Sequence, residues 1–155
     1  MIDFPILSVL TFLPLLGAGL ILLTGEGRAR GVALITSLIV FALSIYMYAN
    51  FNKTSADFQF VEDVAWLPGF NISYKLGVDG ISVFFVLLSA LLTPVCILAS
   101  AHIEKRVRDY MAAFLVLETM MIGMFLSLDM VLFYVFFEGV LLPMFLIIGV
   151  WGGQR

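Results

Sequence analysis

Charged residues are scarce in this sequence. Only 12% of the 155 residues are charged and 63% are apolar, with a mean hydropathy of +1.13. Soluble domains carry about a quarter charged and about half apolar residues. Several stretches lack the polar positions that a water-facing surface needs, so the solvent around them must be membrane lipid. The net charge of −3 argues against nucleic acid as a partner.

Residues that hold metals or cofactors are also nearly absent. The single cysteine, Cys96, can build neither a disulfide framework nor a thiolate metal site. The single histidine, His102, lies just past an apolar run, whereas a haem held between helices needs histidine inside the membrane. There is no Gly-rich phosphate loop, metal-ligand spacing or nucleophile triad. We therefore expect this chain to bind no cofactor and no metal.

What the sequence does contain is long apolar runs. A helix needs about 20 apolar residues to cross the hydrocarbon core. Five segments meet this length, at 4–23, 32–51, 81–101, 111–128 and 130–150. They lack the period-two alternation of a membrane barrel, and only helices or closed barrels satisfy their backbone in lipid. The sequence predicts one all-α membrane domain over 1–155, a polytopic bundle of about five transmembrane helices.

The linkers predict an orientation. The first run has no basic region or cleavage site before it, so we interpret it as a retained helix. Six basic residues fall on one side and two on the other: Arg28, Arg30, Lys105, Arg106, Arg108 and Arg155 against Lys53 and Lys75. The positive-inside rule then places the N-terminus outside and the C-terminus inside. Most acids lie in the outer segments.

The outer loop, 52–80, is the only sizeable polar segment. Alternation at Phe58 and Phe60, and again at Ile72, Tyr74 and Leu76, permits a short β-hairpin. Asp79 follows, where its carboxylate can cap the helix that begins near residue 81.

Glu138 is the residue that most needs an explanation, because it lies in the middle of the fifth apolar run. A carboxylate there costs roughly 2.5–3.5 kcal/mol on insertion scales, and intramembrane acids are functional by default. A protonated glutamate that only bridges helices is the structural alternative. A transport role requires the carboxyl to face a polar interior and not hydrocarbon.

Pro143 and Gly139 weaken the helix beside this acid. Proline removes the hydrogen bond to the carbonyl four residues earlier, which belongs to Gly139, and glycine leaves the backbone uncovered. A water or a neighbouring side chain could enter there, although a simple kink is the alternative.

Glu118 is a second intramembrane acid, in the preceding run. It lies 11 residues before Asp129, and Glu138 lies nine residues after it. At a rise of about 1.5 Å per residue, the two acids are roughly 16 and 14 Å from the turn, near mid-membrane. Proton transfer and a supporting hydrogen bond both remain open for Glu118. No basic residue lies inside any run, so a cationic partner must come from elsewhere.

Four stretches of sequence carry a family resemblance. Tyr-Lys-Leu-Gly-Val-Asp-Gly-Ile-Ser at 74–82 and Leu-Thr-Pro-Val-Cys-Ile-Leu-Ala-Ser at 92–100 resemble the third-helix region of the antiporter-like chain 4 (chain M) of respiratory complex I. Phe-Phe-Glu-Gly-Val-Leu-Leu-Pro-Met at 136–144, followed by Gly-Val-Trp-Gly-Gly at 149–153, is similar to the fifth helix of that family. The resemblance covers nearly the whole chain.

The resemblance implies a proton-translocating subunit of NADH:quinone oxidoreductase with no redox chemistry of its own. NADH, FMN, iron–sulfur clusters and quinone would be used elsewhere in the complex, and the other membrane-arm subunits would be partners. In the family, the fifth-helix glutamate pairs with a lysine of a later helix, and Glu138 matches it by position. The location would be the bacterial or mitochondrial inner membrane. The family subunit has about fourteen helices, so we expect this chain to be a part, a split product or a truncation.

Two other interpretations remain. A subunit of a multi-subunit cation/proton antiporter or membrane-bound hydrogenase shares this architecture. A non-transporting scaffold or assembly protein would tolerate loss of both glutamates.

Overall fold

The structure is a computed structural model that describes residues 6–24, 26–51, 59–67, 69, 72–99 and 107–151. It contains five long helices: α1 (Ile6–Thr24), α2 (Ala29–Ala49), α3 (Ser82–Ala99), α4 (Val107–Leu126) and α5 (Met130–Trp151). All five are long and apolar enough to cross a membrane. The predicted all-α membrane bundle is confirmed. A 3-10 turn, η1 (Glu26–Arg28), joins α1 to α2.

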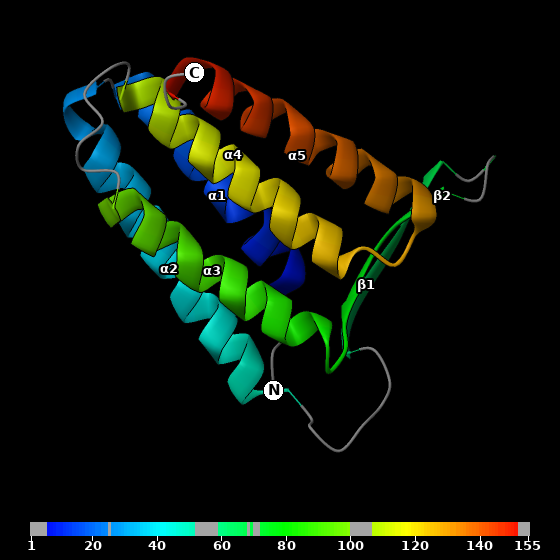
Figure 1. Cartoon of the computed structure of the whole chain (residues 1–155). Helices are drawn as coiled ribbons and strands as arrows, with labels where there is room; N and C mark the ends of the chain where they lie inside the picture. The colour runs from blue at the N-terminus through cyan, green and yellow to red at the C-terminus, as the bar shows by residue number, and fades with distance from the viewer. Residues whose placement is uncertain are drawn as a thin grey trace.

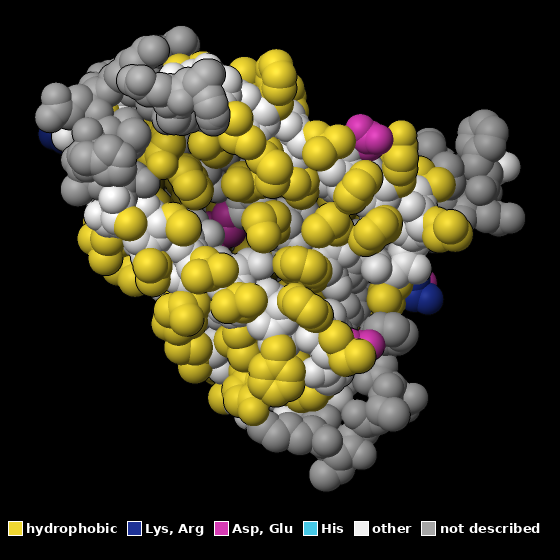
Figure 2. Space-filling view, viewed as in Figure 1, with side chains coloured by type: hydrophobic (Ala, Val, Ile, Leu, Met, Phe, Trp, Pro, Cys, Tyr) yellow, Lys and Arg dark blue, Asp and Glu magenta, His cyan; other side chains and the backbone are white. Residues whose placement is uncertain are grey.

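Helices α1 to α4 form the compact part of the bundle, and α5 lies along one side (Figure 1). α1 packs on α2 and α4, and α2 and α4 both contact α3. Among the described elements, α5 packs mainly on α4 and touches strand β2. Interior apolar side chains such as Leu10, Val40 and Leu115 are fully buried. Hydrophobic side chains also cover most of the outer face in Figure 2, as lipid requires.

Glycines allow close contacts between helices. A methyl group at Gly17 of α1 would lie 2.6 Å from Thr36 of α2, and one at Gly123 of α4 would lie 2.5 Å from the Phe136 ring of α5. Small residues at such positions let membrane helices approach and gain van der Waals contact.

The predicted hairpin is present in the outer loop. β1 (Gln59–Leu67) and β2 (Ile72–Val78) pair antiparallel, with Asp63 opposite Lys75. An irregularity between Gln59 and Glu62 accompanies a positive φ of 56° at Phe60. Phe58 lies outside the described residues. The hairpin also holds the α4–α5 turn, because the N–H of Leu128 donates to the Lys75 carbonyl at 2.9 Å.

Three carboxylates cap the helices that begin at the hairpin end. Asp79 accepts from the N–H groups of Ile81 and Ser82 at 3.1 and 2.9 Å, which confirms the predicted cap of α3. Asp129 accepts from Val131 and Leu132 at the start of α5, at 2.8 and 3.2 Å. These N–H groups have no partner within their own helix, and the positive end of the helix dipole favours a carboxylate.

The cap of α1 comes from the hairpin. Glu62 of β1 accepts from the N–H groups of Leu7 and Ser8 at 2.9 and 3.2 Å, and from the Ser8 hydroxyl. The Tyr74 hydroxyl lies 2.6 Å from the same Ser8 hydroxyl. Burial, and to a smaller extent the Glu62 charge, raise the pKa of Tyr74, although its bond with Ser8 opposes this shift. The acidity of the predicted outer side is thus partly explained by helix capping.

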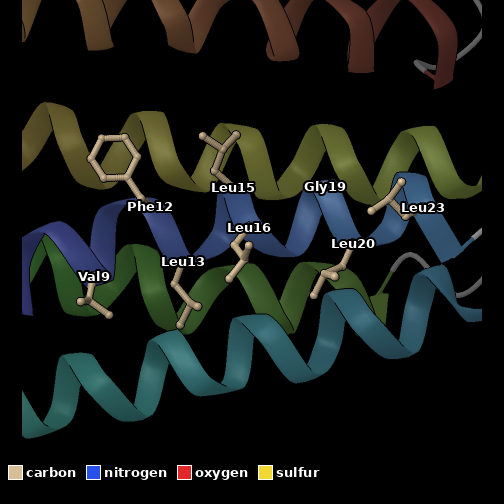
Figure 3. A pocket seen from close by; sticks show the side chains of 8 residues that line it. All are labelled: Val9, Phe12, Leu13, Leu15, Leu16, Gly19, Leu20 and Leu23. Atoms are coloured by element: carbon tan, nitrogen blue, oxygen red, sulfur yellow. The ribbon is translucent and has the colours of Figure 1, made fainter.

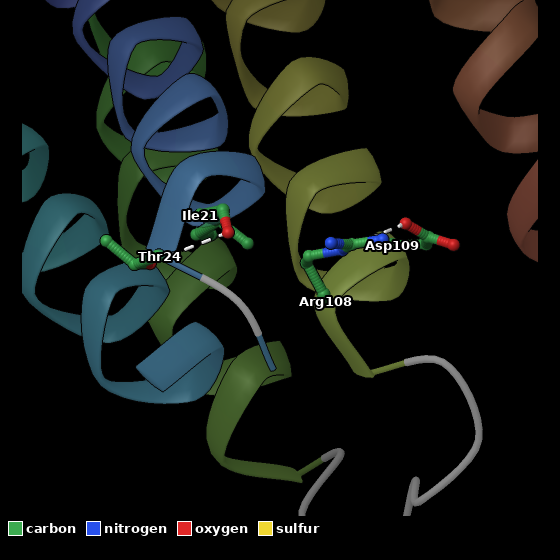
Figure 4. Close-up of polar contacts among 4 residues, drawn as sticks. All are labelled: Ile21, Thr24, Arg108 and Asp109. Carbon is green, nitrogen blue, oxygen red and sulfur yellow. Dashed lines mark hydrogen bonds and ion pairs between the residues drawn. The ribbon is translucent and has the colours of Figure 1, made fainter. Parts of the chain in front are cut away.

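The opposite end of the bundle carries basic residues. Arg28 ends η1, while Arg30 and Arg108 lie in the first turns of α2 and α4, which begin earlier than predicted. Arg108 lies beside Asp109 (Figure 4), and the Arg108 Nε and Asp109 Oδ1 atoms are 3.7 Å apart. Their side chains are 42% and 31% exposed, so this pair adds little stability. The inside–outside orientation stays a prediction, and Lys105, Arg106, His102 and Arg155 lie outside the described residues.

Candidate functional site

Glu138 lies on the outward surface of α5. The residues that α5 buries, Leu132, Phe136 and Pro143, form one stripe that faces α4. At about 100° per residue, Glu138 projects about 140° away from this stripe. Its side chain is exposed. The expected polar interior around Glu138 is therefore not formed by the described residues of this chain.

The surroundings of Glu138 on this surface are mostly apolar. Tyr134, one turn earlier, is exposed and interacts with the carboxyl through its hydroxyl. Phe137, Leu142 and Phe145 are 44%, 64% and 71% exposed. A carboxyl in such a place would face hydrocarbon unless another surface covers it.

Gly139 and Pro143 lie on the packed side of α5. The helix continues without a break through Pro143, which is buried. A methyl group at Gly139 would lie 2.6 Å from the Met120 sulfur, so glycine allows α4 and α5 to approach closely. The proposed weakening of the helix beside the acid stays a hypothesis, and contact with α4 is the role that the structure adds for Gly139.

Glu118, by contrast, is buried inside the bundle with 2% of its surface exposed. It lines a hollow of about 170 Å³ between α3 and α4, together with Ser89, Leu92, Thr93, Cys96, Phe114, Leu117 and Met121. Figure 2 shows acidic atoms deep in a recess between these two helices. Thr93 lies beside the carboxyl but donates its hydroxyl hydrogen to the Ser89 carbonyl at 3.0 Å. Neither carboxyl oxygen has a hydrogen-bond partner among the described residues.

The two acids lie at similar depth but on opposite sides of α4. The close contacts of Gly139 with Met120 and of Phe136 with Gly123 fix the antiparallel register. In that register Glu118 is level with position 141, about 4.5 Å along the axis from Glu138. On α4, however, Glu118 projects about 170° from the side that contacts α5. The two carboxyls therefore do not face each other.

Buried hydroxyls accompany Glu118, and sequence reasoning missed them. Besides Glu118, the buried polar side chains of the described residues are Thr11, Thr36, Ser37, Ser44, Ser89, Thr93 and Thr119. Several bond their own helix: Thr11 donates to Leu7 and Ser44 to Phe41, at 2.8 and 2.6 Å. The Thr119 hydroxyl is buried without a partner among the described residues. All seven lie on α1 to α4.

Another hollow, lined by Asp109 near the start of α4, also contains a carboxylate, but that side chain is partly exposed. A hollow of about 630 Å³ is lined by α1 residues that are all apolar (Figure 3). The described residues contain no group of three or more metal-ligating side chains.

The fold and these residues define a class: a polytopic membrane helix bundle with one buried and one outward-facing intramembrane acid. Residues 6–131 match the family model described as NADH-ubiquinone oxidoreductase chain 4, amino terminus. The chain belongs to this family.

The relatives agree with this assignment. The chain is 49% identical to NADH-quinone oxidoreductase subunit M of Rhodobacter capsulatus, over 97% of this chain and 30% of that protein. It is 48% identical to NADH-ubiquinone oxidoreductase chain 4 of Marchantia polymorpha, over 96% of this chain and 31% of that one. The chain thus spans about 30% of the length of these relatives.

Solved structures share the fold. Respiratory complex I from Thermus thermophilus with bound NADH contains a similar chain, with a TM-score of 0.81 and 26% identity over 96% of this chain and 30% of that chain. The archaeal membrane-bound sulfane sulfur reductase contains another, with a TM-score of 0.77 and 19% identity over 92% of this chain and 23% of that one, which shows the fold alone. With five apolar helices and these relatives, the chain is a multi-pass protein of an inner membrane.

Proposed function

We propose that this chain supplies the amino-terminal helices of a proton-translocating membrane subunit in an NADH:quinone oxidoreductase, and that Glu138 carries protons there. Family membership supports the first part. The second part is supported by Glu138, a carboxyl at mid-span on α5 that nothing in the bundle requires for packing. The chain itself would bind none of NADH, FMN, iron–sulfur clusters or quinone.

This proposal needs a polypeptide surface over the outward face of α5. A carboxyl left in hydrocarbon would cost roughly 2.5–3.5 kcal/mol, whereas a covering helix with a basic side chain would favour its charged form. Among the described residues, Lys and Arg lie only at the helix ends, in η1 or in the hairpin, so the cation has to come from outside them. The relatives are about three times as long as this chain, which leaves room for such a helix.

Within this scheme the residues of α5 have separate tasks. Glu138 gains and loses the proton as the electrostatics of its partner change. Tyr134, one turn away, places its hydroxyl beside the carboxyl. This hydroxyl can form a hydrogen bond with the acid or with a water molecule. Gly139 and Pro143 seat the helix on α4, and the freed carbonyl of Gly139 offers one more acceptor close to the acid.

The test is Glu138→Gln in the complete subunit, assembled in its complex. We expect NADH-driven proton pumping to fall severely, because glutamine keeps the shape and removes the exchangeable proton. Phe145→Leu is the matched control, since Phe145 lies two turns further along the same outward face. Undiminished pumping in Glu138→Gln would reject the proton role. It would favour the scaffold interpretation.

A cation/proton antiporter or membrane-bound hydrogenase subunit is a different assembly with the same fold. The similarity to the sulfane sulfur reductase shows that this fold serves more than one respiratory complex. Purification of the intact assembly separates these alternatives, because the present proposal requires flavoprotein and iron–sulfur subunits that oxidise NADH.

A further inference from the structure

The hollow between α3 and α4 contains polar groups whose hydrogen bonds are incomplete. Both oxygens of Glu118 lack a partner among the described residues although the side chain is 2% exposed. The next residue of α4, Thr119, also has a buried hydroxyl without a partner among the described residues, but it does not line the hollow. Buried polar groups in folded proteins are nearly always paired, either with protein or with ordered water. The unpartnered oxygens of Glu118, which lines the hollow, therefore point to a missing hydrogen-bonding ligand there.

Four of the eight lining residues are apolar, namely Leu92, Phe114, Leu117 and Met121, and the other four carry polar groups that favour water as that ligand. Ser89, Thr93, Cys96 and Glu118 all line it. Its volume of about 170 Å³ accommodates several waters, each of which takes about 30 Å³ in the liquid. An acyl chain that entered from the bilayer would fill the space but leave both carboxyl oxygens unsatisfied. No Lys or Arg of the described residues lines the hollow, so the part of the chain that the structure describes supplies no cation to stabilise the charge of the carboxyl there.

We propose that this hollow is an internal water-binding site in which Glu118 is held as an exchangeable, protonated acid, independently of Glu138. The independence follows from α4, which separates the two carboxyls. Thr93 has its hydrogen committed to the Ser89 carbonyl, so its oxygen is left to accept from a water or from the acid. This inference does not depend on the proposed pumping function.

Infrared spectroscopy of the purified protein in lipid bilayers tests the site. At neutral pH, the wild-type spectrum minus that of Glu118→Gln should show the C=O band of a protonated carboxylic acid. The band should shift when H₂O is replaced by D₂O, because water reaches the proton. Glu138→Gln should leave both the band and its exchange unchanged.

Filling the hollow provides the second measurement. Cys96→Leu adds side-chain volume to the lining and should slow the D₂O exchange of the Glu118 band at least tenfold. Val95→Leu is the matched control, because Val95 is adjacent but 49% exposed on the outer surface, and exchange should stay at the wild-type rate. Thr93→Val keeps the shape and removes one hydroxyl, so the band should move in frequency.

Three results would overturn the proposal. A band that does not respond to D₂O would mean a dry acid. Absence of a protonated band in the difference spectrum would mean an ionised carboxylate with a partner that the hollow does not show. Equal exchange rates in Cys96→Leu and Val95→Leu would mean that water does not occupy this hollow. Loss of pumping in Glu138→Gln, or its retention, bears on none of these outcomes.

Discussion

The two intramembrane glutamates are the same residue in opposite surroundings. Glu118 lies inside the α1–α4 bundle, next to hydroxyl side chains, and is 2% exposed. Glu138 lies at nearly the same depth but on the outward face of α5, among exposed aromatic and aliphatic side chains. An acid in the interior can be satisfied by this chain and a few waters, whereas an acid on the outer face needs a partner from outside the described bundle. Depth along a helix therefore does not define the role of an intramembrane acid.

The largest expected difference between them is the cost of membrane insertion. Glu138→Leu should favour insertion of the isolated α5 segment by about 2.5–3.5 kcal/mol, since a carboxyl at the helix centre is replaced by an apolar group. In the assembled bundle, Glu118→Leu should change the free energy of unfolding much less. The substitution removes the acid together with its two oxygens, which have no hydrogen-bond partner among the described residues. Insertion is measured by the glycosylation pattern of α5 in a reporter protein, and stability by thermal unfolding. A Glu118→Leu protein that loses several kcal/mol would show that the interior acid is firmly paired.

The next largest expected effect concerns the packing of α5 on α4. Gly123→Ala should destabilise the bundle by about 1–3 kcal/mol, because the new methyl group would meet the rigid Phe136 ring at 2.5 Å. Gly139→Ala should cost less, since the atom it meets at 2.6 Å is the flexible end of Met120. Thermal unfolding in detergent compares the two variants. Equal losses would mean that α5 is held by something other than this contact.

These contrasts explain what sequence could and could not predict. Five helices, the hairpin and the Asp79 cap follow from run length, alternation and turn chemistry. The rotation of α4 and α5 about their own axes cannot be predicted from the sequence. Their lipid-facing and interior faces are equally apolar, so no amphipathic period marks the buried side. Glu118 and Glu138 therefore look alike in the sequence. The glycine contacts at Gly17 and Gly123 had a weak signal, namely small residues within long apolar runs.

The buried hydroxyls were missed for a related reason. Serine and threonine are tolerated in membrane helices, where they bond the carbonyl of the preceding turn, so their presence alone does not indicate an interior. Thr11 and Thr93 make such bonds, and Thr119 does not. Only the fold shows that Ser89 and Thr93 line the same hollow as Glu118.

The hairpin cap of α1 gives a smaller effect that concerns the compact bundle alone. Glu62→Ala should cost about 1–2 kcal/mol, because three hydrogen bonds from α1 to the charged carboxylate of Glu62 on β1 are lost. Asp63→Ala is the matched control, since Asp63 is adjacent and exposed. Hydrogen exchange at Leu7 and Ser8 should rise in the first variant only. Exchange that rises equally in both would place the stabilisation elsewhere in the hairpin.

The smallest expected effect is the pH dependence of the Asp79 cap. The N–H of Ser82, helped by that of Ile81, holds the pKa of Asp79 below its ordinary value. A carboxylate with a lowered folded-state pKa contributes stability that is fully present above the unfolded pKa, near 3.8, and is lost as pH falls through the lower folded value. Asp79→Asn should remove this acid-dependent part while keeping most of the cap, since asparagine also accepts from the first N–H groups. Asp79→Ala should cost about 1 kcal/mol at neutral pH. Unfolding midpoints of the three proteins between about pH 2 and 7 measure both effects. If the midpoints of wild type and Asp79→Asn depend on pH in the same way, the charge of Asp79 contributes nothing to the stability of α3.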